Sequence, residues 1–187
     1  MSEKLAVIFP GIGYHKDKPL LYYGAKLLME KGFEVFSVSF HDMPGKIMGD
    51  KDMIRKAAEI AFSQAKEQLS DIDFLSYKEI VFVGKSIGTV ALAKYVHDFD
   101  IKAGQIWYTP LEDTFSFMSK DVISFIGDED PWSDVAKVKE IASEQKIPLF
   151  SYPKCNHSLE TSRIQENIVV LQDVMNKTEK FVEENVR

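Results

Sequence analysis

The chain has 187 residues, a formal net charge of −6 and an isoelectric point of about 5.3. An acidic chain lacks the basic surface that nucleic acids and anionic membranes attract, so we expect neither of them as a partner. Cys155 is the single cysteine, which excludes an internal disulfide framework and most cysteine-based metal sites.

The apolar runs of the chain are all short. Leu5–Phe9 is too short for the core of a signal peptide or for a membrane span, and charged residues interrupt the later runs. No tract rich in proline or serine marks a linker between domains. We therefore expect one domain that covers residues 1–187, in a soluble, cytoplasmic protein.

Six segments have the character of β-strands, and helical segments lie between them. Three of the six, at residues 5–9, 80–83 and 122–126, are apolar almost throughout, as in strands that are buried on both faces of a parallel sheet. The predicted strands are Leu5–Phe9, Glu34–Phe40, Ile80–Val83, Gln105–Tyr108, Val122–Ile126 and Pro148–Tyr152.

The predicted helices begin and end at residues that favour helix termini. Gly32 ends the first helix, Asp50 caps the second, and Ser133 caps the fourth. The helices are Pro19–Lys31, a helix from Asp50 whose apolar positions run to Leu69, Ile87–Val96, Asp134–Glu144 and a last helix with apolar positions from Ile164 to Val182. This alternation predicts an α/β fold, a three-layer sandwich with a mostly parallel sheet of about six strands and helices on both faces.

In such sheets, functional groups gather where the strands end, and two strand ends here are rich in glycine. Gly11 and Gly13 follow the first strand, but a dinucleotide-binding fingerprint needs a third glycine where Lys16 stands. The third strand leads into Gly-Lys-Ser, but a phosphate-binding P-loop needs a glycine where Glu79 stands. A nucleotide-binding module is therefore disfavoured.

Residues 84–88 read Gly-Lys-Ser-Ile-Gly and lie between an apolar strand and a helix. This context fits the Gly-x-Ser-x-Gly nucleophile elbow, a turn so sharp that the serine adopts a strained backbone conformation. The glycines let the strand and the helix pass close together, and the helix N-terminus favours negative charge beside the serine. Ser86 is therefore a candidate nucleophile.

A serine needs a base, and the base needs a group that orients it. Of the four histidines, only His157 follows the last predicted strand. Asp128 and Asp130 both follow the fifth strand, and either could orient the histidine. An ordinary loop histidine and a solvated acidic loop are the alternative explanations. The chain order of serine, aspartate and histidine is that of one particular hydrolase fold.

With these motifs, the sequence resembles the α/β-hydrolase superfamily along essentially the whole chain. It is most similar to the short, lidless serine hydrolases of the dienelactone-hydrolase-like group. The resemblance implies Ser86 as the nucleophile and His157, in a His-Ser-Leu segment, as the base. It also implies Asp130 as the acid in preference to Asp128, because the family's acid stands in a Gly-x-x-Asp-Pro turn.

The resemblance further implies an oxyanion hole formed by the N–H groups of Ile12 and Ile87. The chain departs from the family in three respects. Its first loop begins with Pro10 where relatives often have histidine, its elbow has serine where dienelactone hydrolases have cysteine, and the usual first two strands are absent.

The segment between the fourth and fifth strands, Thr109–Asp121, is too short for a large lid, so we expect an open site that takes a small or protruding acyl group. The candidates to line an acyl pocket are Lys85, Trp107, Tyr108, Phe115, Phe117, Met118 and Trp132. Ordinary core packing is the alternative for each apolar residue, and simple exposure is the alternative for Lys85.

The sequence thus favours a serine hydrolase, most plausibly a carboxylesterase, that needs neither a metal nor a cofactor. The same site attacks thioesters and small amides, so these substrates stay open. The alternative is a hydrolase-fold interaction or scaffold protein with little turnover, because a fold alone does not establish a function.

Overall fold

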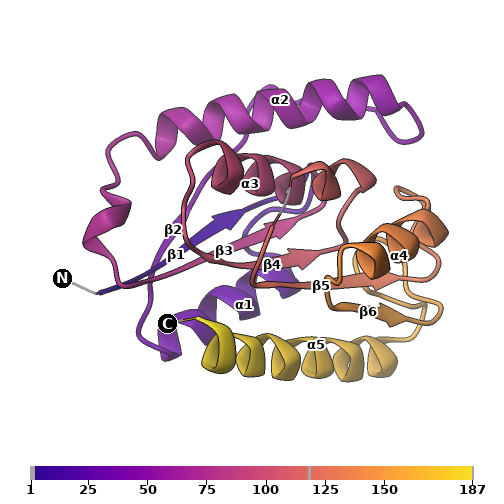
Figure 1. Ribbon diagram of the computed structural model, residues 1–187. Helices are drawn as coiled ribbons and strands as arrows, with labels where there is room; N and C mark the ends of the chain where they lie inside the picture. The colour runs from indigo at the N-terminus through magenta and orange to yellow at the C-terminus, as the bar shows by residue number, and fades with distance from the viewer. Residues whose placement is uncertain (1–2, 118, 187) are drawn as a thin grey trace.

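The computed structural model describes residues 3–117 and 119–186 of the chain (Figure 1). In these ranges, six strands form one sheet in the order β2-β1-β3-β4-β5-β6, and every neighbouring pair is parallel. The strands are β1 (Lys4–Phe9), β2 (Glu34–Ser37), β3 (Glu79–Lys85), β4 (Gly104–Tyr108), β5 (Val122–Gly127) and β6 (Leu149–Tyr152). The predicted α/β sandwich is confirmed.

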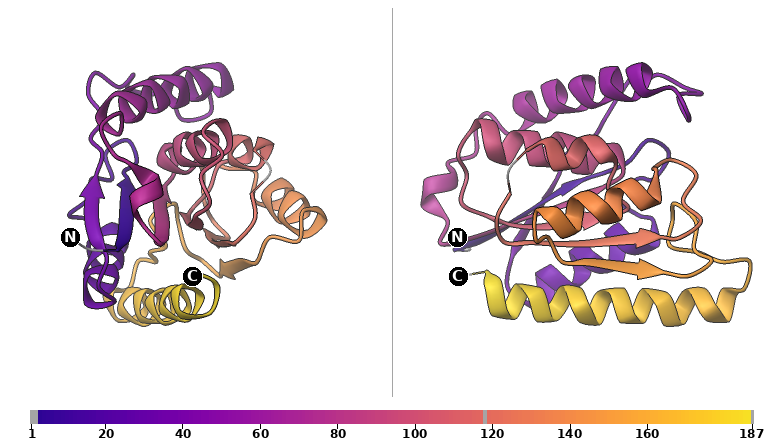
Figure 2. Two further views of the ribbon diagram at one scale, coloured as in Figure 1. Left: turned by 60° about the vertical axis from the view of Figure 1, so that its left-hand side comes forward. Right: turned by 45° about the vertical axis from the view of Figure 1, so that its right-hand side comes forward.

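In the described part of the chain, five α-helices cover the two faces of the sheet (Figure 2). One face carries α1 (Pro19–Glu30) and α5 (Ile164–Asn185). The other face carries α2 (Lys51–Gln68), α3 (Ile87–Asp98) and α4 (Val135–Glu144). None of the helices in the described part of the chain is both long and apolar enough to cross a membrane.

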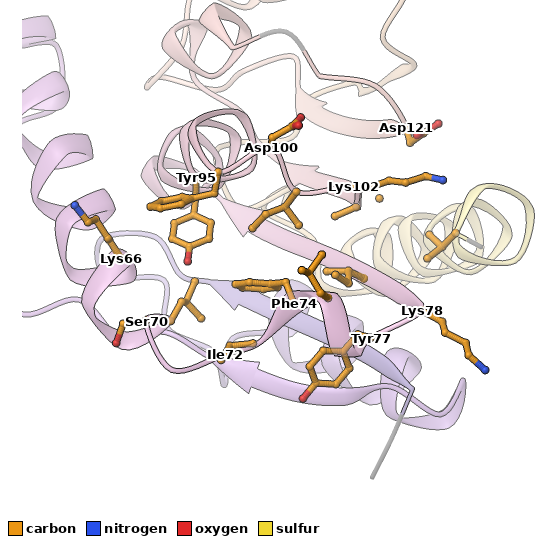
Figure 3. Close-up of a pocket in the computed structure, with 18 of the residues that line it drawn as sticks. Lys66, Ser70, Ile72, Phe74, Tyr77, Lys78, Tyr95, Asp100, Lys102 and Asp121 are labelled. Carbon is orange, nitrogen blue, oxygen red and sulfur yellow. The ribbon is translucent and has the colours of Figure 1, made fainter.

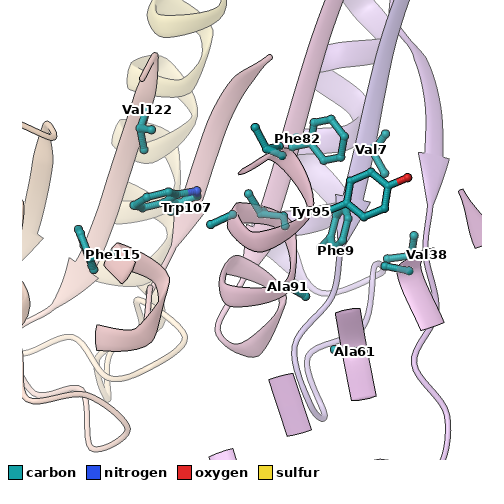
Figure 4. Close-up of a cluster of buried hydrophobic side chains, with 14 of the residues drawn as sticks. Val7, Phe9, Val38, Ala61, Phe82, Ala91, Tyr95, Trp107, Phe115 and Val122 are labelled. Carbon is teal, nitrogen blue, oxygen red and sulfur yellow. The ribbon is translucent and has the colours of Figure 1, made fainter. Parts of the chain in front are cut away.

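Burial of both faces explains why the central strands are apolar throughout. Along β1, Leu5, Val7 and Phe9 pack toward α2 and α3, whereas Ala6 and Ile8 pack toward α1 and α5. Figure 4 shows the first of these cores, in which aromatic rings from β1, β3 and α3 lie together. Each side chain of this size that leaves water contributes about 1.5–3 kcal/mol, so the two cores fix the strand register.

The strand order reverses beside β1. The chain leaves β1 for the sheet edge at β2 and returns to β3 on the other side of β1, where Phe9 pairs with Gly84. The loops that follow β1 and β3 therefore lie side by side at the carboxyl edge of the sheet. Such a switch point is where α/β sheets form their sites.

Strand β2 is shorter than predicted, since it ends at Ser37 and the sequence suggested Phe40. The next residues bind side chains of α2. The backbone N–H of Ser39 donates to Gln68 Oε1 at 2.9 Å, and that of His41 donates to Gln64 Oε1 at 2.8 Å. These amide side chains replace the neighbouring strand as hydrogen-bond partners.

The cap of α4 also differs from the prediction. Asp134 is the cap, and its side chain accepts a hydrogen bond from the backbone N–H of Lys137 at 3.1 Å. The hydroxyl of Ser133, which was the predicted cap, donates to the backbone carbonyl of Pro110 at 3.1 Å. Asp50 caps α2 as predicted, since it accepts from the N–H of Met53.

Between β4 and β5, the described residues form a single 3-10 helix, η2 (Glu112–Ser116), in agreement with the expected lack of a large insertion. Met118, one of the predicted pocket residues, lies outside the described residues. The segment between β4 and β5 therefore covers little of the carboxyl edge of the sheet.

Candidate functional site

Ser86 stands in a strained turn between β3 and α3. Its backbone angles are φ 56° and ψ −123°, a conformation that side-chain-bearing residues rarely adopt and that costs about 1–3 kcal/mol. The flanking glycines make the turn feasible. A Cβ atom on Gly84 would overlap Leu92, and one on Gly88 would overlap the backbone oxygens of Phe9 and Pro10. The predicted elbow geometry is present.

Ser86, His157 and Asp130 form one chain of hydrogen bonds. Ser86 Oγ lies 2.7 Å from His157 Nε2, and His157 Nδ1 lies 2.8 and 2.7 Å from the two carboxylate oxygens of Asp130. A carboxylate accepts, so Nδ1 carries the proton and Nε2 accepts the hydrogen bond from the serine hydroxyl. Asp130 is 5% exposed and Ser86 is 7% exposed, so water competes little for these bonds.

Trp132 fixes both the acid and the base. Its backbone N–H donates to Asp130 Oδ1 at 2.9 Å. Its ring stacks on the His157 ring, with 5.3 Å between the centroids and 22° between the planes. These two contacts restrict the positions of the Asp130 carboxylate and of the His157 imidazole.

The loop that carries His157 is held against the end of β5. The backbone N–H of Glu129 donates to the Cys155 carbonyl at 2.9 Å, and a Cβ atom on Gly127 would overlap that same carbonyl. Within the loop, the Asn156 side chain accepts from the backbone N–H of Ser158 at 2.7 Å. The absence of a side chain at position 127 therefore lets the two loops meet.

The other acidic and histidine candidates lie elsewhere. Asp128 is exposed, pairs with Lys139 at 2.8 Å and accepts from the hydroxyl of Ser151. The structure therefore brings Asp130, and not Asp128, to His157. The remaining histidines are exposed, and they contact other residues: His15 with Asp17, His41 with Ser39, and His97 with Asp98.

Both predicted oxyanion-hole residues lie beside Ser86. Ile12 is in a tight turn in which Gly11 and Tyr14 exchange backbone hydrogen bonds, and a Cβ atom on Gly11 would lie 3.3 Å from Ser86 Cβ. Ile87 is the first residue of α3, so no carbonyl of that helix accepts from its N–H. Their use as oxyanion donors stays a prediction.

Three of the predicted pocket residues belong to the core. Trp107 and Phe115 contact each other edge to face, with 5.3 Å between centroids, and both are buried in the core beneath α3 and α4. The buried Tyr108 side chain lies on the opposite face, where its hydroxyl is 3.1 Å from that of Thr178 in α5. The prediction that these residues line an open pocket is wrong, because all three side chains are buried in the core.

Lys85 does not face the cleft either. Its side chain is 1% exposed, and Nζ lies 4.9 Å from the centroid of the Tyr14 ring. Burial lowers the pKa of Lys85 to about 7, although the charge of Asp130 opposes that shift. The prediction that Lys85 lines the substrate pocket is therefore also wrong.

His157 is electrostatically prepared to accept a proton at neutral pH. Burial lowers its pKa, the positive charge of Lys85 lowers it further, and Asp130 opposes both effects, which leaves the pKa at about 4. The imidazole is therefore unprotonated at neutral pH, in the form that accepts a proton from the serine hydroxyl.

An apolar cluster borders the site on the side of α2 and α3, and we call it the α2–α3 cluster. Two of the partly buried residues packed against it are at the site: Trp132 stacks on His157, and Ile12 follows Gly11, whose backbone comes close to Ser86. Its buried members are Ile47, Ile54, Ala57, Ala58, Ile87, Val90 and Leu111, and Met43, Met53 and Phe117 also pack against it. Sequence reasoning missed Ile47 and Leu111, since loops carry no hydrophobic period.

A cavity of about 720 Å³ lies at the opposite, amino-terminal edge of the sheet, away from Ser86 (Figure 3). Phe74 and Tyr95 contribute rings to it, and charges of both signs, such as Lys66 and Asp121, stand around it. Within residues 3–117 and 119–186, no three His, Cys, Asp or Glu side chains are arranged to hold a metal ion.

The sequence matches no protein-family model and no curated protein, but the structure is similar to those of several hydrolases. The lidless serine hydrolase XC6422 of Xanthomonas campestris is 15% identical with a TM-score of 0.63, and the match covers 100% of this chain and 84% of that one. The esterase Pf2001 of Pyrococcus furiosus is 14% identical with a TM-score of 0.68, and the match covers 97% of this chain and 83% of that one. Est1E of Butyrivibrio proteoclasticus with ferulic acid bound is 15% identical with a TM-score of 0.68, and the match covers 98% of this chain and 90% of that one.

The chain has the α/β-hydrolase fold. The matches span nearly the whole of this chain and more than four-fifths of each of the three others, so they concern the complete fold rather than a shared strand–helix unit. Identities of 13–19% carry the fold and not the substrate.

Proposed function

We propose that the protein is a serine hydrolase that cleaves carboxylic esters, and by the same chemistry thioesters, of a small or accessible acyl group. The single observation that carries the proposal is the unbroken chain of hydrogen bonds from Ser86 through His157 to Asp130, with an imidazole that is unprotonated at neutral pH. The esterase and serine hydrolase structures that share this fold support it.

In the acylation step, Ser86 Oγ attacks the carbonyl carbon while its proton passes to His157 Nε2. The N–H groups of Ile12 and Ile87 stabilise the oxyanion, and the loss of one such donor typically costs about 10²–10³ in rate. His157 then gives the proton to the leaving alkoxide or thiolate, and the acyl group stays on Ser86. Asp130 keeps the imidazole in the Nδ1-protonated tautomer and stabilises its charged form.

In the deacylation step, a water molecule attacks the acyl carbon and His157 Nε2 takes its proton. The tetrahedral intermediate collapses, Ser86 regains that proton from His157, and the carboxylic acid leaves. No group is oxidised or reduced, and every proton returns, so the cycle needs no co-reactant other than water.

The α2–α3 cluster is the proposed acyl-binding surface. It brings Ile12, Ile87 and Trp132 together next to Ser86, so an acyl chain attached to the serine would meet apolar side chains there. The short η2 segment places little over this side, which favours acyl groups that are small or that protrude into solvent.

Turnover of p-nitrophenyl esters graded by acyl length tests the proposal and the depth of the acyl surface together. We expect hydrolysis of acetyl and butyryl esters, with a decline for long chains. Ser86→Ala should reduce turnover by about 10⁴-fold or more and retain the fold. Ser70→Ala, which changes an exposed serine at the opposite edge, is the matched control and should leave turnover unchanged.

Equal turnover by the Ser86→Ala protein would refute the assignment. A folded wild-type protein that hydrolyses none of these esters or their thioester analogues would instead support the alternative, an interaction protein built on a hydrolase fold.

A further inference from the structure

Lys85 precedes the nucleophile in the chain, and its amine is buried in the core and carries a charge below a pKa of about 7. Its ammonium group packs against the face of the Tyr14 ring, and among the described residues no carboxylate oxygen lies within ion-pair distance of it. A buried charge with no direct counter-ion is costly, and a hydrophobic side chain of similar length would fill the same space without that cost. The position therefore calls for a role beyond packing.

The first contact of Lys85 leads to the oxyanion turn. Tyr14 closes that turn through its two backbone hydrogen bonds with Gly11, and its hydroxyl accepts a hydrogen bond from the backbone N–H of Leu20 at 3.1 Å. A cation over an aromatic face contributes about 0.5–2 kcal/mol. Lys85 therefore ties the ring, and with it the turn that carries Ile12, to the end of β3.

The second influence of Lys85 reaches the acid and the base. Its charge is attracted by that of Asp130, and it opposes protonation of His157. Tyr14, over whose ring the amine lies, and Tyr108, the partner of Lys85 in β4, are neutral at neutral pH, because burial raises the pKa values of both. Glu160 acts on Tyr14 from the next loop. Below pH 7, where Lys85 is protonated, its ammonium therefore acts on the carboxylate of Asp130 and on His157.

We infer that Lys85 is a positioning residue for the hydrolysis proposed above, on which this inference rests. Its ammonium holds the Tyr14 ring, and so the oxyanion turn, in place. It also offsets the negative charge of Asp130, which favours protonation of His157, so the imidazole stays unprotonated to a lower pH. One side chain thereby links the two halves of the site, the oxyanion turn on one side of Ser86 and the His157–Asp130 pair on the other.

Lys85→Met removes the charge and keeps the length of the side chain. NMR titration of the His157 ring should show its midpoint moving upward by about one pH unit or more. The acid limb of kcat/KM should move with it, and kcat at the optimum should fall roughly tenfold because the turn is less well held. Melting temperature should stay the same or rise, since a buried charge is lost.

Lys94→Met is the matched control, because Lys94 Nζ also lies over an aromatic ring, 4.6 Å from the centroid of Phe62 in α2. It should leave the His157 titration and the pH profile unchanged. Tyr14→Leu separates the two roles of Lys85, since it removes the ring and retains the ammonium. It should lower kcat and leave the titration of His157 where it is in the wild type.

A folded Lys85→Met protein whose His157 titrates as in the wild type would overturn the inference. If that variant does not fold, Tyr14→Leu decides, and an unchanged kcat would overturn the positioning role. The NMR titration needs no substrate, so failure of this inference is distinguishable from failure of the hydrolase proposal, which ester turnover tests.

Discussion

The two edges of the sheet differ in how their polar side chains are held. The amino-terminal edge holds a cavity of about 720 Å³ with aromatic walls, but the charged side chains around it, such as Lys66 and Asp121, are exposed to solvent. The carboxyl edge holds Ser86, Asp130 and His157, which are nearly buried and joined by hydrogen bonds of 2.7–2.8 Å.

Cavity size alone therefore does not identify the edge that holds the candidate site. A polar group taken out of water is costly unless it is hydrogen-bonded, so three linked polar side chains persist in the interior only where the fold supplies each partner. At the carboxyl edge, the strained turn at Ser86 and the close approach at Gly127 supply them.

The largest expected effect at the carboxyl edge comes from Asp130→Asn. The amide donates as well as accepts, so it no longer enforces the tautomer in which Nδ1 carries the proton, and kcat should fall by about 10⁴-fold. Asp128→Asn is the control two residues away, where the carboxylate pairs with Lys139. It should leave kcat unchanged. Comparable losses in the two variants, measured on one ester, would show that the site has been misplaced.

A smaller effect is expected from crowding the oxyanion turn. In Gly11→Ala, the new Cβ atom would lie 3.2–3.4 Å from atoms of Lys85, Ser86 and Tyr14, so the turn must shift by a few tenths of an ångström. We expect kcat to fall roughly 10- to 100-fold with little change in KM. Gly45→Ala, where a Cβ atom meets nothing within 4 Å, should have no effect. Equal kcat values for the two variants would separate the turn from the reaction.

The pH profile of the wild type should show a low acid limb. The folded-state pKa of His157 is about 4, below its ordinary value of 6.5, so the base stays unprotonated until the pH approaches 4. kcat/KM should therefore be level from pH 7 to 5 and half-maximal near pH 4. Between pH 6.5 and 4, His157 binds a proton in the unfolded chain but not in the folded protein. The free energy of unfolding should therefore decrease as the pH falls through this range. An acid limb centred near pH 6.5 would contradict a His157 pKa that burial and the charge of Lys85 lower.

The smallest expected effect on activity is at the opposite edge. Phe99 is 47% exposed, and its ring centroid lies 4.5 Å from that of Tyr95 beside the cavity. Phe99→Ala should lower the free energy of unfolding by about 1 kcal/mol through the lost ring contact and leave ester turnover unchanged. If Phe99→Ala also loses ester turnover at temperatures where the protein is still folded, the cavity takes part in the reaction.

The sequence predicted the backbone of the site well because its signals are local. Apolar runs located the strands, and the spacing of the glycines around Ser86 predicted the strained turn that the structure shows. Strand β2 was predicted too long, since nothing in residues 38–40 reveals that glutamines of α2 bind them.

Side-chain direction was predicted poorly for a physical reason. A strand buried on both faces has no polar alternation, so the sequence does not tell which core receives Tyr108. The same ambiguity concealed Lys85, since a lysine beside a nucleophile suggests an exposed cleft and the structure buries it under Tyr14. The contributions of Ile47 and Leu111 come from loops, where no periodic pattern exists.

Covalent labelling with a fluorophosphonate, followed by peptide mapping, tests the central claim most directly, because the reagent reacts with a serine that a neighbouring base has activated. We expect one adduct per chain, on Ser86, that disappears in Ser86→Ala and forms far more slowly in His157→Ala. A folded protein that stays unlabelled, or that carries the adduct on another residue, would contradict it.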